Sequence, residues 1–127
     1  MANPAELTVT DANMNGSVAQ PAANAIDTNG TVPADIEGAH ERILLEVNNT
    51  DDAALTVTIK AGSEAAGAGR SSIGDLAVAV AAGAVKLIGP LESARFQQAD
   101  GKVNVAFLAA AGAPAASVRC YRLPKAA

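Results

Sequence analysis

Apolar residues recur at every second position in several short segments of this chain, and no other feature constrains its fold as strongly. The alternation is clearest at 76–80 and 102–108, where Val, Leu or Phe alternate with Ala, Lys or Asn. Successive side chains of a strand point to opposite faces, so this period predicts strands with one buried face. We expect chain reversals at the turn signals Gly89-Pro90 and Asp100-Gly101. The alternating stretch is therefore scaffold and carries no cluster of catalytic residues.

Roughly seven or eight such segments follow one another, with turn residues between them. The expected strands cover residues 6–11, 41–48, 55–60, 76–80, 85–88, 94–97, 102–108 and 117–123. Segments 41–48 and 55–60 flank the turn cluster Asn49-Thr50-Asp51-Asp52 and are predicted to form a β-hairpin. Short strands without a helical period predict an all-β fold, either an antiparallel β-sandwich or a jelly roll.

Residues 12–40 differ from the rest, because they contain few apolar residues and many turn formers. Pro21, Pro33, Gly38 and two Asn-Gly pairs lie in this region. An Asn-Gly pair can form a hairpin turn, so short strands near residues 23–27 fit the sequence, and otherwise we expect an extended arm or long loop. The chain is therefore one domain, with a strand and arm at 1–40 and a sandwich core at 41–127.

The supply of large core side chains in this 127-residue protein is small. Half of the residues are hydrophobic, but about half of these are Ala, and the aromatic residues are Phe96, Phe107 and Tyr121. Because Ala buries a single methyl group, an isolated monomer is expected to have modest stability. This is a hint that neighbouring subunits complete the packing.

The net charge of −4 is distributed unevenly along the chain. Residues 1–64 carry ten acidic and two basic side chains, whereas residues 65–127 carry three acidic and seven basic ones. The halves either interleave into an ordinary mixed surface or form a charged pole that meets a complementary neighbour. Nucleic-acid binding is not expected, because it needs a concentrated basic patch. Arg119, Arg122 and Lys125 are expected to solubilise the last strand and tail.

Neither a secretory signal nor a membrane span is expected. The segment after Met1 lacks a basic region followed by an apolar one. The longest run of low polarity, residues 76–85, is about half of the roughly 20 residues that cross a bilayer. We therefore expect a soluble protein made in a cytoplasm, and its single cysteine, Cys120, excludes an intrachain disulfide.

Two groups of residues could belong to a phosphate or metal site, but neither has the required spacing. The glycines Gly62, Gly67 and Gly69 lack the Gly-Lys-Ser/Thr that a phosphate-binding loop needs, so we expect a flexible loop. His40 is the only histidine and lies near Glu37 and Glu41, whereas zinc sites use three or four clustered ligands. We expect His40 to be solvated.

Three further candidates are assigned structural roles. Asp51 and Asp52 are adjacent and would point to opposite faces, so they are read as turn residues. A calcium loop is conceivable at Asp27, Asn29 and Thr31, which offer an oxygen ligand at every second position, with Asp35 and Glu37 as further acids. The spacing differs from that of an EF-hand and Pro33 intervenes, so we do not expect calcium binding. Cys120 is expected to be a small buried hydrophobe. No catalytic, cofactor-binding or metal-binding residue is predicted, and no cofactor.

Four segments together resemble small β-sandwich virion proteins of tailed bacteriophages. They are RILLEVNN (42–49), LTVTI (55–59), VAAGAVKLIGP (80–90) and FQQADGKVNV (96–105), within a resemblance that spans residues 41–123. Several such proteins are capsid decoration or cement proteins. The resemblance implies a non-enzymatic protein that binds the major capsid protein on the outside of an assembled head, often as a homotrimer at local three-fold positions, and reinforces capsomer junctions.

One feature of the residues agrees with the resemblance, and two other functions stay open. The second face of the alternating strands is rich in small side chains and could lie flat against another subunit; it comprises Thr56, Thr58, Ala77, Ala79 and Ala106. A tail or head-to-tail joining protein is an alternative within the virion. A carbohydrate-binding module is an alternative of another class, weakened because sugar platforms use exposed aromatics and Tyr121 is the single candidate. We expect no enzyme.

Overall fold

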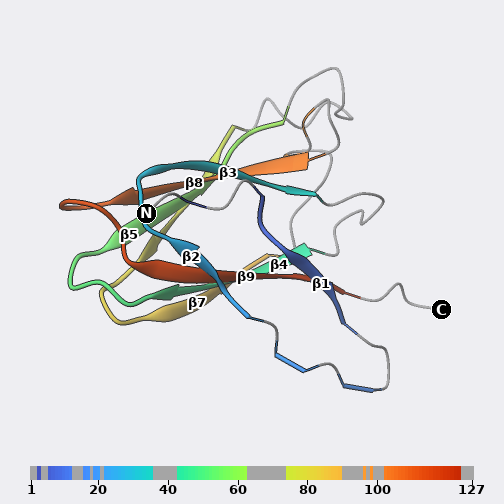
Figure 1. Ribbon diagram of the computed structural model, residues 1–127. Coiled ribbons are helices and arrows are strands. Elements are labelled where there is room, and N and C mark those ends of the chain that lie inside the picture. The colour runs from blue at the N-terminus through green and yellow to red at the C-terminus, as the bar shows by residue number, and fades with distance from the viewer. Residues whose placement is uncertain are drawn as a thin grey trace.

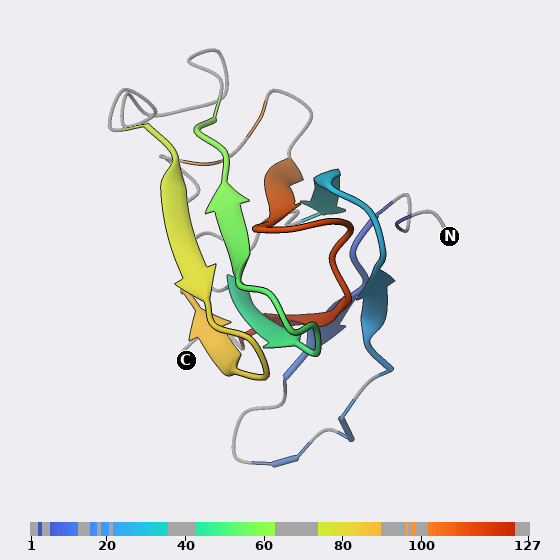
Figure 2. The same ribbon diagram turned by 90° about the vertical axis from the view of Figure 1, so that its left-hand side faces the viewer.

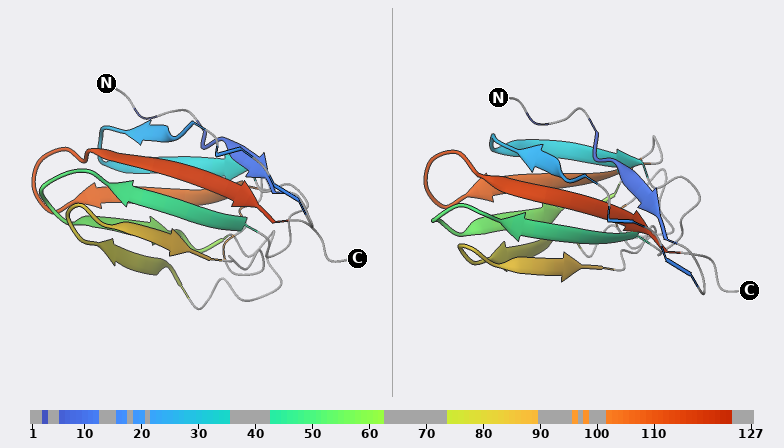
Figure 3. Two further views of the ribbon diagram at one scale, coloured as in Figure 1. Left: turned by 90° about the horizontal axis from the view of Figure 1, so that it is seen from below. Right: turned by 60° about the horizontal axis from the view of Figure 1, so that its bottom comes forward.

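Two β-sheets stacked face to face make up the part of the protein that the computed structural model describes (Figures 1 and 3). The described residues are 3, 6–12, 16–17, 19–20, 22–35, 43–62, 74–89, 96, 98 and 102–123. All nine strands lie in these ranges, which confirms the predicted all-β sandwich.

Each sheet has its own set of strands, and neighbouring strands in it are mostly antiparallel. Sheet A has the order β3 (Gly30–Asp35), β8 (Lys102–Ala109), β5 (Leu55–Ile59), β6 (Leu76–Val80). Sheet B has the order β1 (Val9–Asp11), β9 (Ala116–Arg122), β4 (Ile43–Asn49), β7 (Val85–Ile88), and β2 (Asn24–Ile26) also pairs with β9. The pairing of β1 with β9 is parallel, and the other strand pairs are antiparallel.

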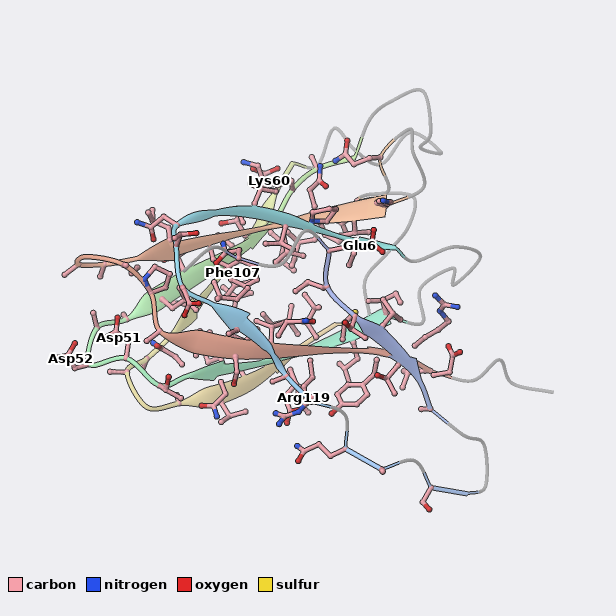
Figure 4. The ribbon with its side chains drawn as sticks, viewed as in Figure 1. Glu6, Asp51, Asp52, Lys60, Phe107 and Arg119 are labelled. Atoms are coloured by element: carbon pink, nitrogen blue, oxygen red, sulfur yellow. The ribbon has the colours of Figure 1, made fainter. Side chains whose placement is uncertain are left out.

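The inward faces of both sheets form one hydrophobic core. In β4 and β5 every second residue is buried, as the alternation predicts. Phe107 is the largest fully buried side chain, and Figure 4 shows it between the two layers. The other core members are mainly Val, Leu and Ile, so Ala contributes little to the interior.

The two sides of the sandwich differ, as the end-on view in Figure 2 shows. On one side Leu7, which precedes β1 of sheet B, forms a parallel bridge with Ala34 of β3 in sheet A. The Leu7 N–H donates to Pro33 O (2.9 Å), so this segment connects the two sheets. On the other side β6 and β7 end their sheets and are joined by the turn at 81–84. In that turn the Ala84 N–H donates to Ala81 O (3.0 Å), and Gly83 has the φ of 73° that favours glycine.

The predicted β-hairpin of residues 41–48 and 55–60 is wrong. β4 lies in sheet B and β5 in sheet A, and each pairs with other strands. Alternation tells which residues of a strand are buried but not which sheet the strand joins. The short connection between them easily spans the roughly 10 Å between stacked sheets.

Much of the predicted N-terminal arm is also part of the sandwich. β2 matches the short strand expected near residues 23–27, but β3 is a full strand along β8. Ile26, Val32 and Ala34 are buried in the core, so this part of the segment packs within the sandwich and does not extend from it as an arm. A strand is also expected at residues 94–97, of which the structure describes Phe96 alone. Phe96 is buried and has a helical conformation, whereas residues 94, 95 and 97 lie outside the described residues.

Candidate interaction surfaces

The outward face of sheet A carries short, uncharged side chains over its full width, and we call it the Ala/Thr face. Strand register brings Ala77, Thr58, Ala106 and Thr31 into one row across β6, β5, β8 and β3. We use the name for the uncharged residues of this face, which are Thr31, Pro33, Thr56, Thr58, Ala77, Ala79, Asn104, Ala106 and Leu108. Leu108 is 58% exposed and is its largest apolar group. The five small residues that the sequence groups together do share this face.

Charged groups lie at one end of this face and are paired there. The Lys60 Nζ lies 3.3 Å from Asp75 Oδ2, and the Lys102 Nζ lies 2.8 Å from Glu6 Oε2. Lys60 directly follows β5 and Lys102 is the first residue of β8. Because these strands are antiparallel, the end of β5 lies beside the start of β8, and both ion pairs are at the same end of sheet A (Figure 4). The centre of the face can therefore be covered without desolvating a charge.

The outward face of sheet B is more polar. Glu46 Oε1 accepts a hydrogen bond from the Tyr121 hydroxyl (3.2 Å) and lies 3.6 Å from an Arg119 guanidinium nitrogen. Desolvation, and then the negative charge of Glu46, raise the pKa of Tyr121 above its usual value. The two side chains of the ion pair are about one-fifth exposed (20% and 21%). Tyr121 is thus tied into a polar cluster and is not a free aromatic platform.

Aliphatic side chains border this cluster on β7. Val85 and Leu87 are 54% and 63% exposed and lie beside Asn48 and Glu46 of β4. They are the large apolar residues most exposed on sheet B among those described. An apolar strip therefore runs along the free edge of sheet B.

A buried asparagine fixes the corner where the chain passes between the sheets. Asn49 is 1% exposed, and its Nδ2 donates to Ala53 O (2.9 Å), Val80 O (3.1 Å) and Ala81 O (3.3 Å). Its Oδ1 accepts from the Asp51 N–H (3.1 Å). The sequence predicts Asn49 as a turn residue, and nothing in the local pattern distinguishes it from the exposed turn residues that follow.

The sequence-predicted metal and acid candidates do not converge in the described structure. Asp51 and Asp52 lie at the tip of the β4–β5 turn, where Asp51 Oδ1 accepts from the Asp52 N–H (2.8 Å), so their reading as turn residues is confirmed (Figure 4). Asn29 Oδ1 accepts from the Ala109 N–H (2.9 Å), which uses this oxygen to hold the end of β8. His40, Glu37 and Glu41 lie outside the described residues, as do Gly67, Gly69 and Lys125.

Cys120 is a core residue, as expected. It is fully buried on β9, and the loss of hydration raises the pKa of its thiol to about 12, against a smaller opposing effect of the Arg122 charge. A thiol needs its thiolate form to act as a nucleophile or metal ligand. Cys120 therefore stays protonated and inert at neutral pH.

Opposite charges from the two halves of the sequence meet on the surface. Glu6 pairs with Lys102, Glu46 with Arg119, and Asp11 Oδ1 lies 3.5 Å from Arg122 Nε. Each of these pairs joins an acid of residues 1–64 to a base of residues 65–127. The halves interleave, so Arg119 and Arg122 hold neighbouring strands together.

The surfaces that the described residues offer are sheet faces, sheet edges and turns. These residues enclose no pocket, and no three of their His, Cys, Asp or Glu side chains lie close enough to hold a metal ion. Within the same part of the chain, no helix has the length and hydropathy to cross a membrane.

Comparisons with protein-family models, curated proteins and solved structures gave no match to this chain.

Proposed function

We propose that this protein is a capsid decoration protein of a tailed bacteriophage. In this proposal it is a virion structural protein that binds the major capsid protein on the outer surface of the head and reinforces capsomer junctions. The Ala/Thr face is the observation that carries the proposal, and the sequence resemblance over residues 41–123 supplies the class of partner.

The chemistry of the Ala/Thr face suits permanent burial against a neighbour. Ala and Pro lose no side-chain entropy when they are immobilised, and Thr loses little. Charged residues are depleted at the centres of protein interfaces because their desolvation is costly. The centre of this face meets that condition, whereas the outward face of sheet B carries the Glu46–Arg119 pair. We therefore assign the capsid contact to sheet A.

The size of the face supports multivalent binding. Its nine residues are fewer than the roughly 20–30 residues that each side of a standard interface contributes. One copy would bind weakly, but copies linked in a homotrimer would engage the capsid together and gain avidity. A homotrimer is therefore part of the proposal.

Co-sedimentation with empty heads tests both the function and the face. The heads are assembled from the major capsid protein of the phage that encodes this chain, and each variant is first shown to melt like wild type. Thr58→Lys introduces a charge at the centre of the Ala/Thr face, and Asn48→Lys introduces the same charge on sheet B. We expect wild type and Asn48→Lys to pellet with heads, and Thr58→Lys to bind at least about tenfold more weakly.

The two ways of failing have different meanings. If wild type does not pellet with heads but binds purified tails or connectors, the protein belongs to the tail or to the head-to-tail junction. If Thr58→Lys binds as wild type does, the capsid contact lies elsewhere on the molecule.

A further inference from the structure

The free edge of sheet B has the properties of a strand-pairing surface. Among the described strands β7 is the last of the sheet, and both of its outward side chains, Val85 and Leu87, are apolar and more than half exposed. The Asn49 N–H donates to Ala84 O (2.9 Å), so by the alternation of an antiparallel ladder the backbone groups of Val85 and Leu87 point away from β4. This edge offers both hydrogen-bonding groups and apolar surface to another strand.

Lys86 lies between these two residues and carries a charge that no described carboxylate neutralises. Lys60, Lys102, Arg119 and Arg122 each lie within 3.6 Å of a carboxylate oxygen. The Lys86 Nζ instead donates to the backbone oxygen of Ala79 on β6 (2.7 Å), so its ammonium group extends across the open side of the sandwich. Lys86 pairs with the buried Val47, which places it on the inward side of the strand.

The geometry of antiparallel pairing determines what a second copy would meet at this edge. In one register, Val85 lies opposite Leu87 of the second copy and Leu87 lies opposite Val85 of the second copy. This register brings the exposed apolar side chains of both copies into contact. The same register sets Lys86 directly opposite Lys86 of the second copy. Like charges at directly opposed positions destabilise a strand pair. Each ammonium group would also lose water without gaining an acidic partner.

We propose that Lys86 keeps β7 from pairing with β7 of a second copy of this chain. Natural proteins protect exposed sheet edges with inward-pointing charges, and lysine is common in this role. Without the charge, two copies would share one continuous sheet B across a two-fold axis. Because such an interface uses the same strand of both copies, each chain makes one such contact, which doubles a monomer and joins homotrimers into assemblies of at least twice their mass.

Replacement of Lys86 tests this proposal in the full-length protein. Lys86→Val makes β7 apolar along its length, and we expect the mass measured by light scattering to rise to at least twice that of wild type at high concentration and to fall on dilution. Lys86→Thr removes the charge and adds less apolar surface, and it should give the same rise in mass if Lys86→Val precipitates. In the doubled species, amide hydrogen exchange at Val85 and Leu87 should slow relative to wild type.

Two controls separate loss of the edge charge from loss of any charge. Lys86→Arg and Lys60→Val should both keep the wild-type mass, because the first retains the charge and the second lies away from a sheet edge. The double variant Lys86→Val/Leu87→Lys should return to the wild-type mass. The proposal is overturned if both neutral variants keep the wild-type mass, if Lys60→Val doubles as well, or if β7 amides are already protected by self-association in wild type.

Discussion

Removal of the Asn49 side chain is the most informative stability test of this fold. The amide has two N–H groups for three carbonyl oxygens, so the bonds to Ala53 and Val80 (2.9 and 3.1 Å) carry most of the interaction. Each bond contributes about 0.5–1.5 kcal/mol net, and a buried carbonyl left without a donor costs about 1–3 kcal/mol. We expect Asn49→Ala to lower the free energy of unfolding by about 3 kcal/mol, and Tm by about 10 °C.

Urea unfolding followed by circular dichroism measures this effect, with Asn48→Ala as the matched control. Asn48 is the preceding residue of the same strand, on the half-buried outer face, so its replacement should cost less than about 0.5 kcal/mol. The reasoning is refuted if Asn49→Ala costs less than about 1 kcal/mol, or no more than Asn48→Ala at an unchanged m-value.

The substitution Asn49→Asp adds a pH test of the same site. An ionised carboxyl cannot donate to the three carbonyl oxygens, whereas a protonated one can donate a single bond. The folded state should therefore bind this proton more tightly than the unfolded chain, in which an Asp carboxyl has a pKa of about 3.9. The variant's deficit relative to wild type should be smallest below that pH and grow as pH rises through the folded-state pKa. A deficit that does not change with pH would contradict the donor role.

Three further predictions concern the core and the sheet B cluster. Because the pKa of Cys120 rises from 9.0 to about 12 on folding, the folded state holds this proton more tightly, and the free energy of unfolding should decrease as the pH rises from 9 to 12. Cys120→Ala should remove this decrease in unfolding measurements. If the decrease persists in the variant, other groups cause it. Tyr121→Phe removes the donor to Glu46 and should cost about 0.5–1.5 kcal/mol in urea unfolding, whereas no loss would mean that water replaces this bond. Phe107→Ala should cost about 3–5 kcal/mol and Leu108→Ala less than about 0.5 kcal/mol, and similar losses for both would contradict their placement inside and outside the core.

The sequence pattern predicts burial well but not strand pairing. β6 and β7 have the expected bounds, because their alternation is regular and turns flank them. The β4–β5 hairpin fails, because alternation assigns residues to faces while the sheet that a strand joins depends on contacts distant in sequence. Local evidence therefore defines the strands and leaves the topology open.

β3 shows a second limit of sequence evidence. Pro33 argues against a strand, but β3 is an edge strand of sheet A, where a residue without an N–H is tolerated. The Ala/Thr face was predictable in part, since its five small residues follow from alternation. Thr31 and Pro33 join it only through the pairing of β3 with β8. The role of Asn49 depends entirely on carbonyl groups brought together by the fold.

A cryo-EM reconstruction of empty heads incubated with the purified protein tests the proposed capsid role most directly. The proposal predicts added density in a regular array on the outer surface, grouped in threes at local three-fold positions, with sheet A facing the capsid. Absence of added density, or density confined to the portal vertex or the tail, would contradict it.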